Sequence, residues 1–253
     1  VAVGSRVSAF KPGDAVFAFT GSGLGCHVEY RCLAANGAVA LKPPDLSYAQ
    51  AAALSFGGAT MLDFYGRAAL KAGERVLVNG ATGTVGTAAV QLARHFGAHV
   101  TAVCRQEHAD LVSSLGAHRV IDRESQDFAA GSTAYDVIVD TAGTAPFARC
   151  APVLARHGRL LLVLATLAEM LRSPWNTLRS GKRVIAGPAA ERAEYVHRLR
   201  DLACARHFLP VIDRTYPFDE IRAAHEHVDR GHKAGSVVVE IEPGLWKTKV
   251  AAR

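Results

Sequence analysis

Hydrophobic and polar positions follow two different patterns along this chain, and the change comes near residue 71. From there, short apolar runs typical of buried strands alternate with segments in which apolar residues recur at helical spacing. They predict helices at 85–96 and 110–115 and strands at 75–79, 100–104, 119–121, 136–140, 159–164 and 182–186. Strands separated by helices favour a parallel sheet with right-handed crossovers, so this region is predicted to be a doubly wound α/β domain.

The two ends of the chain are richer in turns and short β segments. A turn at 11–14 precedes a predicted strand at 15–19. Ser47 and Gln50 have the spacing of a capping box, which begins an Ala-rich helix from 48 to about 70. Beyond residue 191, the pattern predicts helices at 193–207 and 219–228, the second capped by Asp219, and a final strand at 236–241.

These changes divide the chain into residues 1–53 and 192–253, which form a β-rich domain, and residues 54–191, which form the α/β domain between them. The sequence begins without methionine and with a strand-like pattern already running. We therefore expect a natural N-terminal segment to precede it, and the β-rich domain to be partial.

Composition narrows the classes of protein. The longest apolar run, at 160–171, is shorter than the roughly 20 residues that cross a bilayer, and no signal peptide opens the chain, so a cytoplasmic protein is expected. The net charge of +6 comes from scattered Lys and Arg, which argues against nucleic-acid binding. The five cysteines include no C-x-x-C pair, so we expect buried or partly buried free thiols rather than disulfides or a four-cysteine zinc site.

A glycine-rich loop follows the first predicted strand of the α/β region and opens a helix. Its glycines, Gly80, Gly83 and Gly86, are spaced G-x-x-G-x-x-G rather than G-x-G-x-x-G. In this context Gly83 would let the backbone approach a pyrophosphate, and Gly86 would let the helix pack closely. The phosphates would lie at the positive end of the helix. The alternative is an ordinary strand–helix turn.

The residues after the second and third strands indicate which dinucleotide binds. Sites for NAD usually carry Asp or Glu at the end of the second strand, where it bonds the ribose 2′-hydroxyl. Here Cys104 is followed by Arg105, and no carboxylate comes before Glu107. Arg105 and Arg123, at adjacent strand ends, suit a 2′-phosphate, so NADP is predicted. The alternative for each arginine is a solvated surface charge.

Four stretches resemble the medium-chain dehydrogenase/reductase superfamily, in particular its zinc-independent quinone oxidoreductase-like or NAD(P)-dependent alcohol dehydrogenase-like branch. They are V-S-A-F-K-P-G-D at 7–14 with the strand after it, G-A-T-G-T-V-G at 80–86 with the helix after it, Y-D-V-I-V-D-T-A-G at 135–143, and 210–239, which ends in G-H-K-A-G-S-V-V-V. The resemblance implies a Rossmann domain flanked by a GroES-like, mostly β catalytic domain, with the active site between them. It also implies homodimers formed by pairing of the Rossmann-sheet edges.

The same resemblance implies the residues that contact the cofactor, including a threonine near the nicotinamide. The full predicted set is Thr60, Gly80, Ala81, Thr82, Gly83, Thr84, Val85, Gly86, Cys104, Arg105, Arg123 and Thr144.

No metal site is predicted. Cys26 and His27 are neighbours on an expected strand, so their side chains would point to opposite faces and could not easily share one ion. His225 and His227 lie two apart on a predicted helix, do not face each other, and are interpreted as surface residues.

No catalytic residue is assigned from the sequence. Tyr30, Tyr65 and Tyr135 are candidates for a proton donor on chemistry alone, although Tyr65 is expected to pack a helix and Tyr135 to begin a buried strand. The resemblance implies hydride transfer from NADPH to a small-molecule quinone or α,β-unsaturated carbonyl compound. Two alternatives stay open: a zinc-type alcohol dehydrogenase and a nucleotide-binding protein without catalysis.

Overall fold

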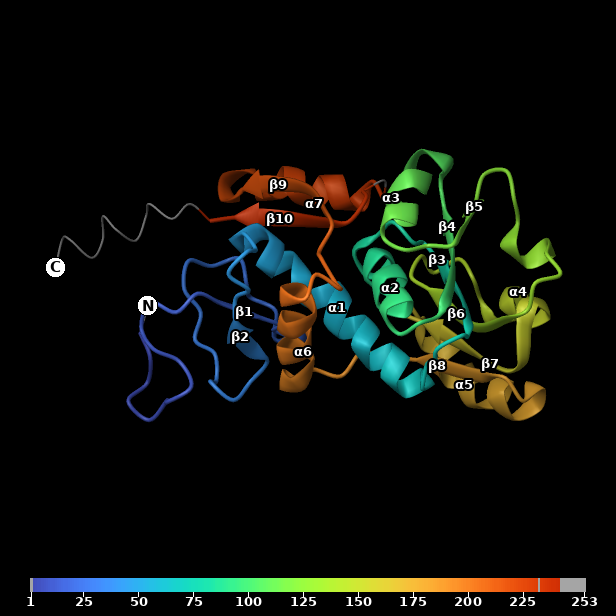
Figure 1. Ribbon diagram of the computed structural model, residues 1–253, viewed down its shortest axis with the longest axis horizontal. Helices are drawn as coiled ribbons and strands as arrows, with labels where there is room; N and C mark the ends of the chain where they lie inside the picture. The colour runs from blue at the N-terminus through green and yellow to red at the C-terminus, as the bar shows by residue number, and fades with distance from the viewer. Residues whose placement is uncertain (1, 232, 242–253) are drawn as a thin grey trace.

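A six-stranded, entirely parallel sheet dominates the computed structural model, which describes residues 2–231 and 233–241 (Figure 1). Its strands are β3 (Arg75–Asn79), β4 (His99–Cys104), β5 (Arg119–Asp122), β6 (Tyr135–Asp140), β7 (Leu154–Leu162) and β8 (Arg183–Ala186). They lie in the order β5-β4-β3-β6-β7-β8, so the chain winds outward from β3 in one direction and from β6 in the other. This is the strand order of the Rossmann fold, and the predicted doubly wound α/β class is confirmed.

Successive residues of each strand point to opposite faces of the sheet. Both faces carry buried apolar side chains, as is usual for a parallel sheet. Val76 and Val78 are fully buried in the larger core cluster, under the helices α1 (Tyr48–Ala68) and α2 (Thr84–His95). Leu77 and Ile138, also fully buried, join a second cluster with Phe128 on the opposite face. Shorter helices complete the region: α3 (Ala109–Ser114), α4 (Phe147–Cys150) and the 3-10 turns η2 (Gln106–His108), η3 (Phe128–Ala130) and η4 (Ala151–Val153).

Helix α1 joins the sheet to the rest of the molecule (Figure 1). It begins with the predicted capping box: Gln50 N–H donates to Ser47 Oγ at 3.1 Å, and Ser47 N–H donates to Gln50 Oε1 at 2.9 Å. It packs closely on α2, since a Cβ at Gly57 would lie 2.4 Å from the Thr84 carbonyl oxygen. The boundary proposed at residue 53 falls inside this continuous helix; the division into domains stays a prediction.

The two ends of the chain form separate small sheets beside α1. One pairs β1 (Val16–Ala18) with β2 (Val39–Leu41) antiparallel, and the other pairs β9 (Ile212–Pro217) with β10 (Ser236–Glu240) in parallel. The turn η5 (Phe218–Glu220) and helix α7 (Ile221–Asp229) connect β9 to β10, and α6 (Ala193–Cys204) packs on α1 and β2. A 3-10 turn, η1 (Gly21–Gly23), follows β1. Both β1 and β10 pack against α1, so these two strands from opposite ends of the chain lie beside the same helix.

Some local expectations were wrong. The helix α5 (Leu167–Ser180) was not predicted, because Pro174 interrupts its pattern and the apolar end of β7 precedes it. Its own capping box uses Thr166 and Glu169. Asp219 does not cap α7, whose N-cap is Glu220 without a side-chain bond. The thiols of three cysteines expected to be at least partly buried are exposed, namely Cys26, Cys32 and Cys204.

No helix in residues 2–231 and 233–241 combines the length and hydropathy that a membrane span needs.

The close contact of α1 with α2 gives a stability prediction. Gly57→Ala places a methyl group against the backbone of Thr84, and we expect it to lower the free energy of unfolding by about 1–3 kcal/mol. Gly66→Ala in the same helix meets no atom within 4 Å and should raise stability by up to about 1 kcal/mol. Urea unfolding of both variants checks this, and equal effects of the two substitutions would contradict the packing described.

Candidate cofactor site

A cavity of about 380 Å³ opens where the strands β3, β4 and β6 end. Asn79 and Gly80 line it after β3, Cys104 and Arg105 after β4, and Thr144 after β6. The carboxyl ends of parallel strands meet at one edge of a sheet, and the order of this sheet reverses between β3 and β6. Ligands of open α/β sheets bind at such a point, so this cavity is the candidate cofactor site.

The glycine loop forms one side of the cavity. Gly80 adopts φ +81°, and the N–H groups of Gly80 and Ala81 donate to the carbonyl of Val103 at 3.2 and 3.1 Å. Gly86 is required by packing, since a Cβ there would lie 2.1 Å from the Gly80 carbonyl oxygen. At Gly83, the N-cap of α2, a Cβ would meet only the Gly80 oxygen, at 3.9 Å. Internal packing therefore explains Gly86, whereas the space where a Cβ of Gly83 would stand is free, so a phosphate can approach the N-terminus of α2 from that side.

The two predicted arginines line the same cavity. Arg105 is one quarter exposed, and its Nε lies 3.1 Å from Glu124 Oε1 while its Nη1 lies 3.5 Å from Glu107 Oε1. Both glutamates are largely exposed, so these ion pairs are weak and leave further guanidinium donors free. Arg123 has no carboxylate within ion-pair distance among the residues that the structure describes. The arrangement can hold a phosphate group at the ends of β4 and β5.

A buried carboxylate organises the loop between β6 and α4. Asp140 is 2% exposed, and its oxygens accept hydrogen bonds from Asn79 Nδ2 at 2.8 Å and from three backbone N–H groups. Asn79 also donates to Thr144 Oγ1 at 2.9 Å. The four donors compensate the burial of the charge and fix Thr144 beside the cavity. This role of Asp140 was not predicted from the sequence, although Asn79 and Asp140 are polar residues at the ends of two apolar strands.

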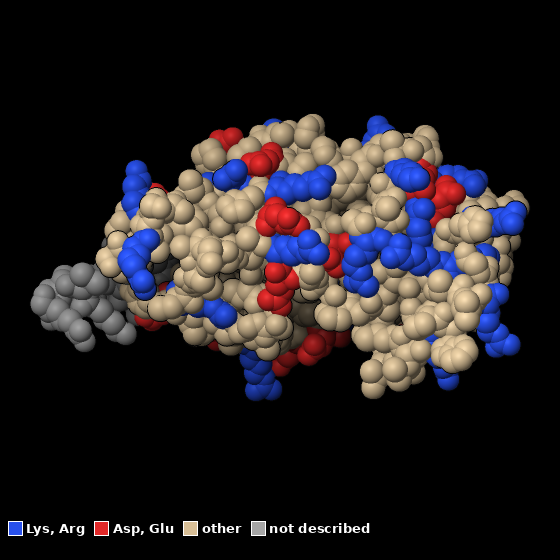
Figure 2. Space-filling view, turned by 90° about the horizontal axis from the view of Figure 1, so that it is seen from below, with Lys and Arg blue, Asp and Glu red and all other residues tan. Residues whose placement is uncertain are grey.

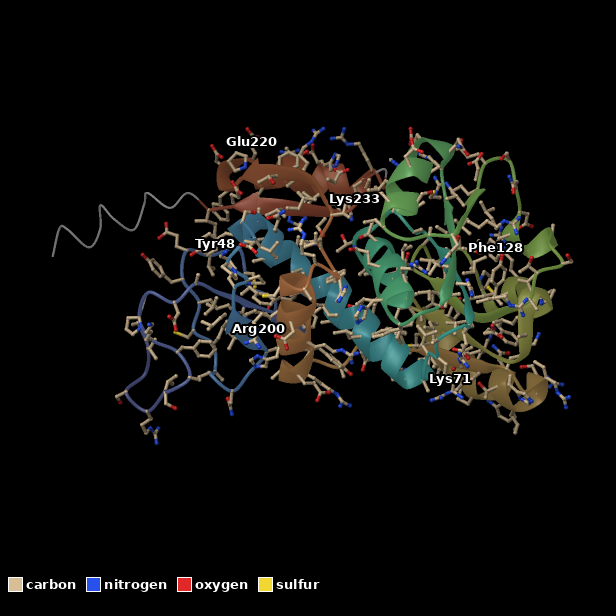
Figure 3. The ribbon with its side chains drawn as sticks, viewed as in Figure 1. Tyr48, Lys71, Phe128, Arg200, Glu220 and Lys233 are labelled. Atoms are coloured by element: carbon tan, nitrogen blue, oxygen red, sulfur yellow. The ribbon has the colours of Figure 1, made fainter. Side chains whose placement is uncertain are left out.

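Other basic residues in the cavity wall were also missed. Arg149 donates to the Thr144 carbonyl at 3.0 Å and to Asp127 Oδ1 at 2.9 Å, and its guanidinium lies 4.6 Å from the centre of the Phe128 ring. Lys233 enters the cavity from the segment before β10. Figure 3 labels Phe128 and Lys233, which lie on either side of β4 in that view. With Arg105 and Arg123, these side chains make the wall strongly basic.

The predicted contact residues divide into three groups. Gly80, Thr82, Cys104, Arg105, Arg123 and Thr144 line the cavity, and Ala81, Gly83, Thr84, Val85 and Gly86 form the rest of the loop and the first turn of α2. Thr60 is buried within α1 and does not line this cavity, so its contact with the nicotinamide stays a prediction.

The thiol of Cys104 lies in the cavity wall. Burial and, to a smaller extent, the charge of Asp122 raise the pKa of Cys104 to about 11, while Arg123 opposes the shift. Its sulfur therefore presents a neutral, polarisable surface to a ligand.

A second, larger cavity of about 1080 Å³ has a mostly apolar lining from β1, the loop after it, the first turns of α1, and β10. Tyr30 lines this cavity and is half exposed. Tyr65 is buried and donates to the Ala89 carbonyl at 2.8 Å, and burial raises its pKa far above the ordinary value. Tyr135 is also buried, at the start of β6. Of the three tyrosines, Tyr30 is the one that lines this larger cavity.

Of the four residues considered as metal ligands, His225 is exposed, as expected, and the other three are placed differently from our expectation. Cys26 and His27 lie in an irregular loop rather than a strand. His225 packs its ring 5.7 Å from that of His27, while His227 is only partly exposed and its Nε2 lies 2.6 Å from Asp213 Oδ2, so it is not a simple surface residue. Within residues 2–231 and 233–241, no three His, Cys, Asp or Glu side chains gather as a metal site would require.

Comparison with known proteins agrees with this geometry. The family described as zinc-binding dehydrogenase matches residues 115–239. A chloroplast quinone oxidoreductase of Triphysaria versicolor is 32% identical over 252 residues, covering 95% of this chain and 76% of that protein. A mitochondrial NAD(P)H oxidoreductase of Mus musculus is 30% identical over 271 residues, covering 94% and 67%.

A solved structure extends the agreement to three dimensions. The quinone oxidoreductase from Coxiella burnetii superposes with a TM-score of 0.86 at 27% identity, over 95% of this chain and 76% of that one. The match therefore includes both β-rich ends as well as the central sheet. The chain belongs to the medium-chain dehydrogenase/reductase superfamily, among its quinone oxidoreductase-like members.

Proposed function

We propose that this protein is an NADPH-dependent oxidoreductase that transfers hydride to a quinone or an α,β-unsaturated carbonyl compound. The observation that carries the choice of NADPH is the pair Arg105 and Arg123, which line one cavity beside the glycine loop. A guanidinium group binds phosphate oxygens in a planar, bidentate geometry, which suits the 2′-phosphate that distinguishes NADPH from NADH.

The residues of this chain bind and orient the cofactor, and the bound nicotinamide supplies the hydride. The open N-terminus of α2 at Gly83 receives the pyrophosphate, and the Asp140–Asn79 network fixes Thr144 where the dinucleotide crosses the sheet. The apolar lining of the larger cavity supports an apolar substrate. The names of the relatives, which include quinone oxidoreductases, support the same substrate class.

The zinc-type alcohol dehydrogenase is tested by metal analysis of the purified protein. One equivalent of tightly bound zinc per chain would favour that alternative, which the description of the matched family raises. A protein that binds NADPH but turns over no quinone or enone would favour the non-catalytic alternative.

We also propose that the protein forms a homodimer at the β8 edge of the sheet. The helix α5, which packs on β8, exposes four large apolar side chains, namely Leu167, Leu171, Trp175 and Leu178. Their exposed fractions run from 68% to 79%, and a second copy of the chain would cover them.

On the face shown in Figure 2, basic side chains are interspersed with acidic ones and with uncharged surface, which supports a small-molecule rather than a nucleic-acid ligand. A cytoplasmic location stays a prediction.

The assignment of Arg105 to the 2′-phosphate gives a prediction on cofactor choice. Arg105→Ala should raise the Kd for NADPH about 10- to 100-fold, as expected for lost hydrogen bonds to a charged group, and change the Kd for NADH little. Fluorescence titration with both cofactors measures this. Arg222→Ala, at a fully solvated arginine on α7, is the matched control and should change neither Kd. Equal losses for NADPH and NADH would refute the assignment of Arg105 to the 2′-phosphate.

The proposed interface at α5 gives a prediction on assembly. We expect light scattering to give twice the chain mass of 26.8 kDa, and Leu171→Glu to give the monomer, because a buried charge at the α5 interface would be unpaired. Leu24→Glu, at a leucine equally exposed but distant from α5, should leave the dimer intact. A monomeric unaltered protein at micromolar concentration would contradict the proposed interface.

A further inference from the structure

The segment before β10 closes back on the glycine loop (Figure 1). Gly235 N–H donates to the Thr82 carbonyl at 2.7 Å, and Gly83 and Gly235 pair as an isolated β-bridge. Thr84 Oγ1 donates to the Gly235 carbonyl at 3.0 Å. The segment before β10 therefore forms a wall of the cofactor site, although a long stretch of sequence separates it from the strands of the Rossmann sheet.

Among the described residues, Lys233 is the only basic residue of this wall that lies against the start of α2. Its Nζ donates to the Gly235 carbonyl at 2.7 Å and to Thr84 Oγ1 at 3.0 Å, and its side chain lines the cavity. An ammonium has three N–H donors, so these two neutral acceptors leave one donor free, and neither acceptor neutralises the charge. Burial lowers the pKa of Lys233, and Asp213 acts in the opposite direction.

Asp213 holds this segment in place. Its Oδ1 accepts the Ala234 N–H at 2.7 Å, and its Oδ2 lies 2.6 Å from His227 Nε2. Burial opposes the ionisation of Asp213, but the bonds from Ala234 and His227 outweigh it and keep the pKa below its ordinary value. The carboxylate thus connects β9 and α7 to the residue that follows Lys233.

We propose that Lys233 binds the pyrophosphate of the dinucleotide, and that Asp213 with His227 acts as the positioning pair for it. The inference rests on the proposed function, since it deepens the same site. Thr84, which Lys233 contacts, is the first residue of α2, where the positive end of a helix receives a pyrophosphate. Arg105 and Arg123 lie instead at the ends of β4 and β5. Because NADPH and NADH both contain the pyrophosphate, Lys233 should contribute to the binding of both cofactors.

The test compares Lys233→Met, which keeps the shape of the side chain without its charge, with Lys233→Arg. We expect Lys233→Met to raise the Kd for NADPH and for NADH by a similar factor of about 10, and Lys233→Arg to retain most of the affinity. Calorimetric titration with adenosine 2′-monophosphate, which has the 2′-phosphate and no pyrophosphate, should give the same Kd for both variants as for the unaltered protein. Lys233→Gln replaces the methionine variant if its melting curve shows unfolding.

The positioning pair is tested by a double-mutant cycle. Asp213→Asn should weaken the binding of both cofactors. Adding it to Lys233→Met should raise either Kd little further, because the two substitutions remove the same interaction. A purely structural role for Asp213 would instead give additive losses.

Three results would overturn the inference. Weaker binding of NADPH alone, together with weaker binding of adenosine 2′-monophosphate, would assign Lys233 to the 2′-phosphate. Unchanged affinity of Lys233→Met for both cofactors would leave Lys233 a purely structural residue. If the unaltered protein bound neither dinucleotide, the proposed function itself would fail, which is distinct from either outcome.

Discussion

The site depends on one constraint, which is that all six strands of the central sheet are parallel. Their carboxyl ends must then meet at the same edge, and the reversal of order between β3 and β6 leaves a crevice there. Asn79 and Asp140 end these two strands, and their 2.8 Å hydrogen bond joins them across the reversal. The buried carboxylate is tolerated because four donors surround it, and the same donors order the loop that carries Thr144.

The cavity at this edge collects positive charge from separate parts of the fold. Arg105 and Arg123 come from neighbouring strand ends, Arg149 from the helix α4, and Lys233 from the segment before β10. The nearby glutamates are exposed and screened, so they reduce this charge without cancelling it. A dinucleotide with three phosphate groups matches the sign of such a wall, which is why NADPH rather than NADH is proposed.

Helix α1 and the segment before β10 connect this site to the β-rich ends. Gly57 permits α1 to touch the backbone of Thr84, and the Gly235 N–H reaches the Thr82 carbonyl from the opposite end of the chain. Both contacts fall on the glycine loop or the first turn of α2. A movement of either β-rich part would therefore displace residues at the place where the phosphates are proposed to bind.

The sequence by itself determined the local elements and the class of the fold. The apolar runs of β3 and β6, the capping box of Ser47 and Gln50, and the glycine loop all depend on neighbouring residues, and each was found where predicted. It also placed Arg105 and Arg123 at strand ends that the fold brings to one cavity. Only the tertiary structure showed that Lys233 reaches Thr84, that His227 is held by Asp213, and that Asp140 is enclosed by donors. The contacts of Lys233 with Thr84 and of Asp140 with Asn79 join residues separated by long stretches of chain, and no local periodicity records such distances.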